Sequence, residues 1–296
     1  MNPAAPVGAG LVDRFYQAGR RLRRLPILRR ATWFWTAAHL PIFAVLRLGQ
    51  WGVRQKLARG LVWRIPGFFL RRDWENYEKE AVGALVDWCR APTASPKIFL
   101  DAGSSVAPYS AIALFADPAL EAYAFEPDFE SLRFAPVFCR YAPGARLKCV
   151  HGFLADVPGP GETLAAAVQR TTAAMDAAPR PPHLPSTCYR VLGGAGTEGI
   201  PVRSLDQLTG RGAELRGRPV ALKIDVEGWE LDVLRGAAEL LRHARPVVLL
   251  SVHPDVLPKL GRTTTEVEDF LRGVGYRWTV VGVDHEEHWW CTPATP

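Results

Sequence analysis

Short apolar runs alternate with helix-like segments from residue 97 to the end of the chain, and this alternation constrains the fold most strongly. The apolar runs have the length of strands, and the segments between them carry apolar residues at helical spacing. The expected strands are 97–100, 122–125, 147–151, 220–224, 246–252, 276–283 and 288–291, and the expected helices are one after Asp73 and then 110–115, 132–139, 230–242 and 264–272. This order predicts an α/β fold with a doubly wound, mostly parallel sheet, closed by its last two strands as an antiparallel pair.

One long segment interrupts the alternation. Residues 157–199 are rich in Pro, Gly and Ala and carry little strand signal. Long connections of this kind inside a compact domain are usually functional loops or linkers. We therefore expect one α/β domain over residues 73–296, with an inserted, partly helical lid or loop at 157–199.

Basic residues are concentrated at the N-terminus. Residues 1–72 carry 14 Lys and Arg against a single acid, Asp13, whereas residues 73–296 carry 22 basic and 29 acidic residues. A basic segment attached to a mildly acidic body favours a polyanionic partner, either an anionic membrane surface or nucleic acid.

Aromatic residues interleaved with arginine favour the membrane among these partners. Residues 31–46 hold no Asp, Glu, Lys or Arg, but they are too few to span a bilayer comfortably. Rings such as Trp33 and Trp35 beside arginines are typical of a helix that lies in the headgroup interface. We expect residues 1–72 to form a helical, membrane-interfacial arm. Packing of the arm on its own body or on a partner protein remains an alternative, as does nucleic-acid binding, for which no recognised motif is present.

The cysteines indicate a reducing compartment. None of the five forms a C-x-x-C pair, which argues against a zinc cluster or a disulfide framework and fits buried thiols. Residues 1–30 lack a small-residue cleavage site after an apolar core, so a secretory signal is not expected. The expected location is the cytoplasm, where the arm would hold the protein on the cytoplasmic face of the membrane.

The candidate site lies where the expected parallel strands end, because ligands of doubly wound sheets bind outside the carboxyl ends of the strands. Asp101, Gly103 and Ser104 follow the first buried strand, and a glycine there lets backbone amides approach a ligand. Glu126 ends the next strand, 23 residues beyond Gly103, where an acid can accept both ribose hydroxyls. A plain turn glycine and a solvated acid are the alternatives. Because G-x-G-x-x-G is absent, the pattern favours a nucleoside cofactor without a pyrophosphate, such as S-adenosylmethionine.

Two acids and a histidine at later strand ends are candidate catalytic residues. Asp225 and Glu227 project to the same side of an extended chain, and His253 follows the next strand at the same rim. A hydroxyl acceptor attacks well only if its proton is removed, and each of these groups could be the base. Helix capping by the acids and a structural role for the histidine are the alternatives. We expect no resident metal, although a divalent cation held by Asp225 and Glu227 remains an alternative.

The residues from about 98 to 253 resemble the FkbM family of S-adenosylmethionine-dependent methyltransferases, which have the class I methyltransferase fold. The most specific element is the sequence K-I-D-V-E-G at 223–228, followed by 230–237. Segments 125–127, 203–208 and 252–253 support it. The resemblance implies that Asp101 and Gly103 hold the amino-acid part of the cofactor, that Glu126 holds its ribose, and that Asp156 lies near the adenine.

The resemblance also implies the reaction. Family members mostly methylate hydroxyl oxygens of sugars and natural products, and several are associated with cell-surface polysaccharide; Asp225 and Glu227 would face the methyl group and the acceptor. This chain has Ala107 where the family usually has Gly, and Ser251 where an acid is common. The expected activity is O-methylation of a hydroxyl on a sugar, polysaccharide or natural product. A non-catalytic methyltransferase-like module that docks on a membrane assembly is the alternative.

Overall fold

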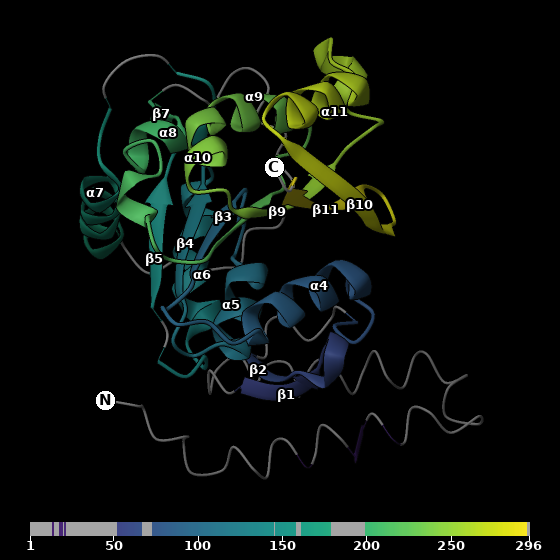
Figure 1. Cartoon of the computed structure of the whole chain (residues 1–296). Coiled ribbons are helices and arrows are strands. Elements are labelled where there is room, and N and C mark those ends of the chain that lie inside the picture. The colour runs from purple at the N-terminus through teal and green to yellow at the C-terminus, as the bar shows by residue number, and fades with distance from the viewer. Residues whose placement is uncertain are drawn as a thin grey trace.

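The computed structural model describes residues 52–66, 73–144, 146–157, 161–178 and 199–294, with a few isolated positions between 14 and 21. A seven-stranded sheet forms its centre, with the order β10-β11-β9-β8-β3-β4-β5 (Figure 1). The strands are β3 (Ile98–Ala102), β4 (Glu121–Glu126), β5 (Leu147–His151), β8 (Val220–Ile224), β9 (Val247–Val252), β10 (Tyr276–Val283) and β11 (Glu287–Pro293). The first five are parallel, and β11 and β10 close the sheet as an antiparallel pair. The predicted doubly wound α/β fold is confirmed.

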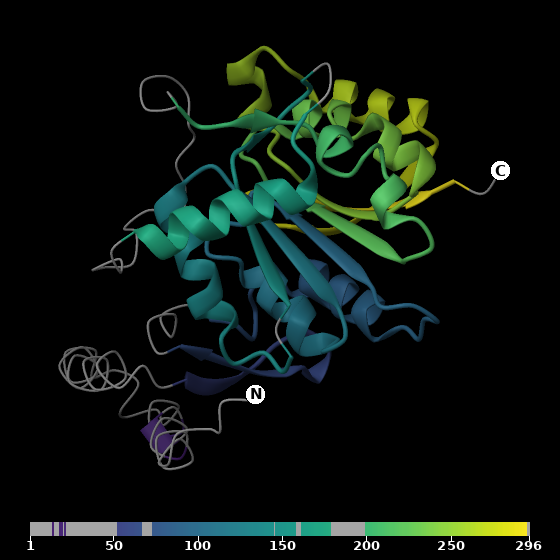
Figure 2. The same ribbon diagram turned by 90° about the vertical axis from the view of Figure 1, so that its left-hand side faces the viewer.

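Helices cover both faces of the sheet (Figure 1). One face carries α4 (Lys79–Arg90), α5 (Pro108–Ala116) and α6 (Phe129–Cys139), and the other carries α8 (Leu205–Leu208), α9 (Glu230–Arg235), α10 (Ala238–His243) and α11 (Thr264–Gly273). A further helix, α7 (Leu164–Ala177), packs along β5 (Figure 2). It falls in the expected lid segment, of which residues 158–160 and 179–198 lie outside the described residues.

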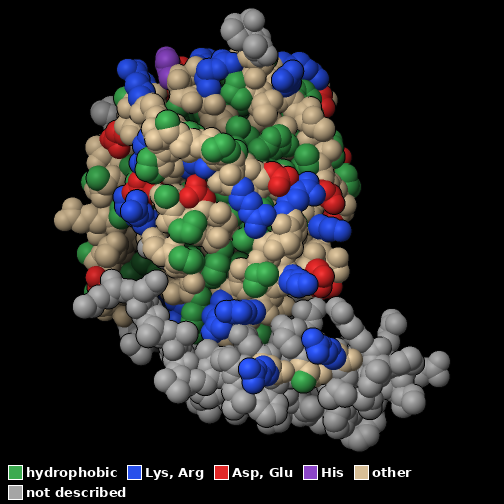
Figure 3. Space-filling model, turned by 60° about the horizontal axis from the view of Figure 1, so that its bottom comes forward, with side chains coloured by type: hydrophobic (Ala, Val, Ile, Leu, Met, Phe, Trp, Pro, Cys, Tyr) green, Lys and Arg blue, Asp and Glu red, His purple; other side chains and the backbone are tan. Residues whose placement is uncertain are grey.

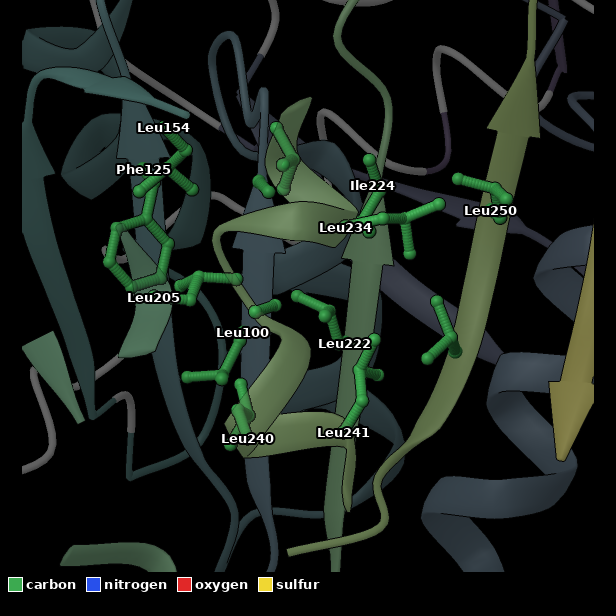
Figure 4. Close-up of a cluster of buried hydrophobic side chains, with 14 of the residues drawn as sticks. Leu100, Phe125, Leu154, Leu205, Leu222, Ile224, Leu234, Leu240, Leu241 and Leu250 are labelled. Atoms are coloured by element: carbon green, nitrogen blue, oxygen red, sulfur yellow. The ribbon is translucent and has the colours of Figure 1, made fainter. Parts of the chain in front are cut away.

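Each face of the sheet has its own apolar core, because successive strand residues point to opposite faces. Leu100, Leu222 and Leu250 pack under α9 and α10 (Figure 4). Phe99 and Leu249 belong to the core under α4 and α5. Burial on both faces explains why these strands appear in the sequence as continuous apolar runs. The cysteines of the described residues are buried thiols, as expected: Cys89, Cys139, Cys149 and Cys291.

The predicted helix over 230–242 is two helices in the structure, and that expectation was wrong. The chain breaks at Gly236 and Ala237, between α9 and α10. A Cβ on Gly236 would lie 2.3 Å from the carbonyl oxygen of Ala155. The absence of a side chain at Gly236 therefore lets the segment after β6 (Phe153–Leu154) approach the backbone between the two helices. β6 pairs with β7 (Val202–Arg203) in a small parallel sheet of its own.

Part of the expected helical arm is a β-hairpin, which corrects the helical prediction for residues 52–66. β1 (Gly52–Lys56) and β2 (Val62–Pro66) pair antiparallel around the 3-10 turn η1 (Ala58–Gly60). Trp63 and Ile65 are fully buried, and the Trp63 ring lies 4.9 Å from the Trp74 ring and 5.5 Å from the Phe138 ring, between ring centroids. This portion of the arm is thus attached to the α4–α6 face.

The surface beside this hairpin has mixed chemistry. Figure 3 brings the bottom of Figure 1 forward and shows Lys and Arg side chains next to apolar ones, with Asp and Glu among them. Within the part of the chain that the structure describes, no helix combines the length and the apolarity that crossing a membrane requires. The remaining expectations for the arm fall almost wholly outside the described residues.

Candidate active site

The side chain of Asp101 fixes the position of the loop after β3. Its carboxylate is buried and accepts hydrogen bonds from the backbone N–H and the hydroxyl of Ser110, at 3.0 and 2.6 Å. Burial raises the pKa of Asp101 to about 6, against the opposing effect of Lys223 and Ser110. Asp101 therefore ties the end of β3 to the first turn of α5 and fixes the position of the loop between them.

The loop itself has an unusual backbone. Gly103 has φ +77°, and Ser105 and Ala107 also have positive φ, at 51° and 61°. Ala107 thus adopts the left-handed conformation that glycine favours. The hydroxyls of Ser104 and Ser105 are buried and make no hydrogen bond within the described residues. Buried hydroxyls without partners are uncommon, so this loop has free hydrogen-bonding capacity.

Glu126 connects the end of β4 to the same loop. The residue is only 9% exposed, and its carboxylate accepts hydrogen bonds from the backbone N–H groups of Ser105 and Asp128, at 2.7 and 2.9 Å. Burial raises the pKa of Glu126 to about 7, although the two N–H donors oppose this shift. Each carboxylate oxygen can accept a further hydrogen bond, so Glu126 retains room for a ligand hydroxyl.

Asp156 lies in a different setting. It is exposed, in the segment after β6, and its backbone nitrogen packs beside Gly236. The contacts of the described residues do not connect its side chain to Asp101 or Glu126. Its predicted place near an adenine ring remains a prediction.

Asp225 follows β8 and is hydrogen-bonded to the neighbouring strand β3 and to a lysine of β8 itself. Its backbone N–H donates to the carbonyl of Ala102, at 2.9 Å, and its carboxylate accepts a 2.7 Å hydrogen bond from Lys223. Burial would raise the pKa of Asp225, but the Lys223 ammonium outweighs it and holds that pKa below its usual value. Lys223 is itself buried and lies 4.3 Å from the centroid of the Tyr109 ring.

Glu227 adopts a strained backbone next to Asp225. Its φ is +51°, a conformation that a residue with a side chain rarely adopts outside sites where the surroundings enforce it. A quarter of its side chain is exposed, and its Oε2 lies 3.4 Å from Nε2 of His253. Burial raises the pKa of Glu227, while the nearby His253 lowers it.

His253 is enclosed by carboxylates. Its Nδ1 lies 2.6 Å from Oε1 of Glu230, and its Nε2 lies 2.7 Å from Oε2 of Glu286 and 3.7 Å from Oδ1 of Asp225. Burial lowers the pKa of His253, but the contacts with Glu230 and Glu286 outweigh burial and raise it to about 10. The structure thus brings together Asp225, Glu227 and His253, the three predicted catalytic residues.

Sequence reasoning missed several members of this cluster. Glu230 and Glu286 are fully or nearly fully buried against His253, and buried His288 faces Ser251 across the β9–β11 pair, with 3.1 Å between its Nδ1 and the serine Oγ. Oε1 of Glu286 lies 3.6 Å from Nε2 of His288. Glu286 and His288 are two residues apart, as Ser251 and His253 are, and this spacing was the one sequence signal that could have marked them as site residues. The antiparallel pairing of β11 with β9, which brings Glu286 next to His253, arises from tertiary structure and has no such signal.

Comparison with known proteins identifies a family. Residues 99–278 match the family described as Methyltransferase FkbM domain. No curated protein matches the sequence.

Several solved structures are similar at low sequence identity. A precorrin-6y C5,15-methyltransferase from Geobacter metallireducens is 14% identical with a TM-score of 0.40, over 73% of this chain and 88% of that one. A methyltransferase FkbM from Methylobacillus flagellatus is 15% identical with a TM-score of 0.42, over 67% of this chain and 43% of that one. The S-adenosylmethionine-dependent methyltransferase SibL in its apo form is 14% identical with a TM-score of 0.40, over 98% of this chain and 78% of that one.

Proposed function

The chain belongs to the FkbM methyltransferase family, and from that premise we propose that it transfers a methyl group from S-adenosylmethionine to a hydroxyl of a sugar, polysaccharide or natural product. One structural relationship supports this proposal above the others. The loop that carries Gly103 touches the backbone of Asp225, so the candidate cofactor loop and the candidate catalytic acids are adjacent.

The cofactor assignment rests on the chemistry around the β3–α5 loop. A nucleoside cofactor with an amino-acid tail needs hydroxyl, carboxylate and backbone groups that have spare hydrogen-bonding capacity. Ser104 and Ser105 offer buried hydroxyls without partners, and Glu126 offers two carboxylate oxygens beside them. These residues fit such a cofactor, with Glu126 at the ribose hydroxyls and the loop at the amino-acid tail.

The bound cofactor would supply a methyl group on a cationic sulfur. The protein has to align the acceptor oxygen with that methyl group, exclude water and remove the hydroxyl proton. The acidic rim of Asp225 and Glu227 lies next to the cofactor loop, and its negative charge favours a cationic ligand. This arrangement matches what methyl transfer to a hydroxyl requires.

Among the three candidate bases, Glu227 is the one that we assign. His253 is only 3% exposed and both of its ring nitrogens lie against buried glutamates, Glu230 and Glu286, so an acceptor hydroxyl from solvent does not reach the ring. Asp225 is tied to Lys223 through Oδ2. Glu227 is partly exposed, and its closest charged contact within the described residues is with the His253 ring, at 3.4 Å. It can therefore reach an acceptor hydroxyl that approaches from solvent.

Calorimetric titration of the full chain with S-adenosylhomocysteine tests the proposal. The expected result is binding at one site per chain, weakened roughly 10- to 150-fold when Glu126 is replaced by Ala. A chain that folds but does not bind the compound would instead be a non-catalytic methyltransferase-like module. Glu227→Gln should then separate chemistry from binding, because it should lower methyl transfer while leaving cofactor affinity unchanged.

We further propose that the basic N-terminal segment docks the protein on the cytoplasmic face of a membrane. The supporting observation is the charge distribution, with 14 basic residues and one acid in residues 1–72. An acceptor linked to a lipid would then be presented to the active site at the same surface. Flotation with anionic vesicles, described in the Discussion, tests this second proposal independently of the first.

A further inference from the structure

The acidic rim continues inward into a buried cluster that the methyl-transfer proposal does not use. Glu230, His253, Glu286 and His288 are each at most 3% exposed. Glu78, whose side chain is 6% exposed, accepts a hydrogen bond from Tyr109 at the outer end of the cluster. Groups of this kind are stable in a protein interior only when their charges are compensated.

The fixed charges of the cluster do not balance. The cluster holds five carboxylates, from Glu78, Asp225, Glu227, Glu230 and Glu286, and one buried ammonium, that of Lys223, which also faces buried Asp101. Even with both imidazoles protonated, at least two negative charges remain in excess. A divalent cation would reduce this excess, because its two positive charges outweigh the one proton that His253 releases to become a ligand.

Several buried polar atoms of the cluster also have no hydrogen bond. Nε2 of His253, Oε2 of Glu286 and Nε2 of His288 are all without a partner of hydrogen-bond geometry among the described residues. The 2.7 Å contact between His253 Nε2 and Glu286 Oε2 is close but poorly aligned for a hydrogen bond. Two atoms that bind the same metal ion lie at a similar distance from each other and form no hydrogen bond between them.

We propose that Asp225, His253 and Glu286 bind a divalent first-row metal ion, such as Mn²⁺ or Zn²⁺. One oxygen of each acid and Nε2 of the histidine all lie within 4.8 Å of one another. Donors about 2.1 Å from an ion lie about 3.0–3.4 Å apart at octahedral or tetrahedral angles. The distances from His253 Nε2 to Glu286 and Asp225, 2.7 and 3.7 Å, bracket that range.

The surroundings of His253 match those of a metal ligand. Its other nitrogen, Nδ1, faces Oε1 of Glu230, which also accepts a hydrogen bond from the backbone N–H of Gly228 at 2.8 Å. A carboxylate on the outer nitrogen fixes the ring and directs the lone pair of Nε2 toward the metal. One nitrogen and two carboxylate oxygens suit Mn²⁺ and Zn²⁺ and leave coordination positions open.

An ion at this position could also position the acceptor for methyl transfer. It would lie beside Glu227, whose Oε2 is 3.4 Å from Nε2 of His253, and it could bind the acceptor oxygen next to that base. Only this last step rests on the proposed methyl transfer. Binding of the ion itself is independent of it.

Metal titration of the full chain tests the site. Protein stripped with EDTA and exchanged into metal-free buffer is titrated with Mn²⁺ and with Zn²⁺ in a calorimeter, and loss of the free Mn²⁺ electron paramagnetic resonance signal gives an independent count. The expected result is one ion per chain for at least one metal. Glu286→Gln and the more exposed Asp225→Asn should each weaken binding at least about tenfold, as loss of a ligand or of its support does.

Glu268→Gln, the same chemical change on the outer surface of α11, is the matched control and should bind metal as the wild type does. Circular dichroism checks the fold of each variant. Wild-type protein that binds neither metal overturns the inference, as does a folded Glu286→Gln or Asp225→Asn variant with wild-type affinity. S-adenosylhomocysteine binding is measured separately in EDTA. Its loss with metal binding intact would count against the methyl-transfer proposal alone.

Discussion

Gly103 packs directly against the backbone of Asp225, so closely that a Cβ on Gly103 would lie 1.7 Å from the Asp225 carbonyl oxygen. The contact joins the loop after β3 to the segment after β8, and the 2.9 Å hydrogen bond from Asp225 N–H to the Ala102 carbonyl reinforces it. The two halves of the candidate site are therefore held together by backbone atoms. A side chain at residue 103 cannot be accommodated without separating them.

Gly103→Ala should accordingly destabilise the fold strongly. The new methyl group must displace the Asp225 carbonyl, and the positive φ of +77° adds the cost of a left-handed backbone, about 1–2 kcal/mol. Gly217→Ala is the matched control, because Gly217 has φ +76° and a Cβ added there would have no neighbour within 4 Å among the described residues. Urea unfolding should show a loss at Gly103 that exceeds the loss at Gly217 by at least about 2 kcal/mol. Equal losses would mean that the contact is easily relaxed.

Ala107→Gly should leave the fold intact and tighten cofactor binding. Glycine removes the left-handed strain at φ 61°, worth about 1 kcal/mol, but it also removes a buried methyl group that packs near Leu132 and Cys149, worth about 0.8 kcal/mol. The free energy of unfolding should therefore change by less than about 1 kcal/mol. Calorimetry with S-adenosylhomocysteine measures the affinity, and a weaker complex would show that the alanine loop has its own working geometry.

Glu126→Ala should weaken cofactor binding more than Glu121→Ala. Both residues lie on β4, but Glu126 ends the strand beside the β3–α5 loop, whereas Glu121 begins it and pairs with Lys148 and Arg218 at the opposite end. Loss of a charged hydrogen-bond partner costs about 1.5–3 kcal/mol, roughly 10- to 150-fold in Kd. Calorimetry on both variants gives the comparison. Equal affinities would remove Glu126 from the cofactor site.

The raised pKa of Glu126 should make stability depend on pH. Its pKa rises from 4.5 in an unfolded chain to about 7 in the fold because burial favours the neutral acid, with Asp101 and Asp128 nearby adding to the shift. The unfolded chain therefore releases this proton first, and the contribution to stability is fully present below pH 4.5 and is lost as the pH rises to about 7.

The measurement compares the wild type with Glu126→Gln, which cannot titrate. Urea unfolding of both proteins at several pH values between about 4.5 and 7.5 should show the wild type losing up to about 3 kcal/mol relative to the variant. Parallel curves for the two proteins would show that Glu126 keeps its ordinary pKa in the fold. The ionised form at higher pH is the one suited to accept ribose hydroxyls.

The sheet could be predicted from sequence because its strands carry strong local signals. β8 and β10 begin and end at the predicted residues, since apolar runs such as 220–224 are bounded by charged or glycine-rich turns. The break in the helix at Gly236 could not be predicted, because it reflects the approach of Ala155 from a distant segment. The same holds for Trp63, whose aromatic neighbours suggested a membrane surface and whose actual partner is a protein core.

The site residues likewise fall into those that local sequence signals predict and those that only tertiary contacts bring together. Asp101, Glu126, Asp225 and His253 could be placed at one rim because parallel strands share an orientation, and their positions follow from strand ends alone. Glu230 and Glu286 approach His253 through helix packing and an antiparallel return strand, which no local pattern encodes. The left-handed backbone of residue 107 agrees with the glycine that the family usually has at that position.

The N-terminal segment should bind anionic vesicles in a salt-dependent way. Each Lys or Arg near an anionic surface contributes roughly 1 kcal/mol at low salt, and salt screens that contribution, while Trp33, Phe34 and Trp35 should add a salt-resistant part. Replacing the four arginines of 20–24 by Gln should weaken flotation with anionic vesicles and leave S-adenosylhomocysteine binding unchanged. The truncated protein for comparison begins at Gly52 and should not float. It does not begin at Asp73, because that would remove the β1–β2 hairpin, whose Trp63 is buried in the protein core. Equal flotation of the truncated and full-length proteins, or a preference of the full chain for RNA over vesicles at physiological salt, would contradict membrane docking.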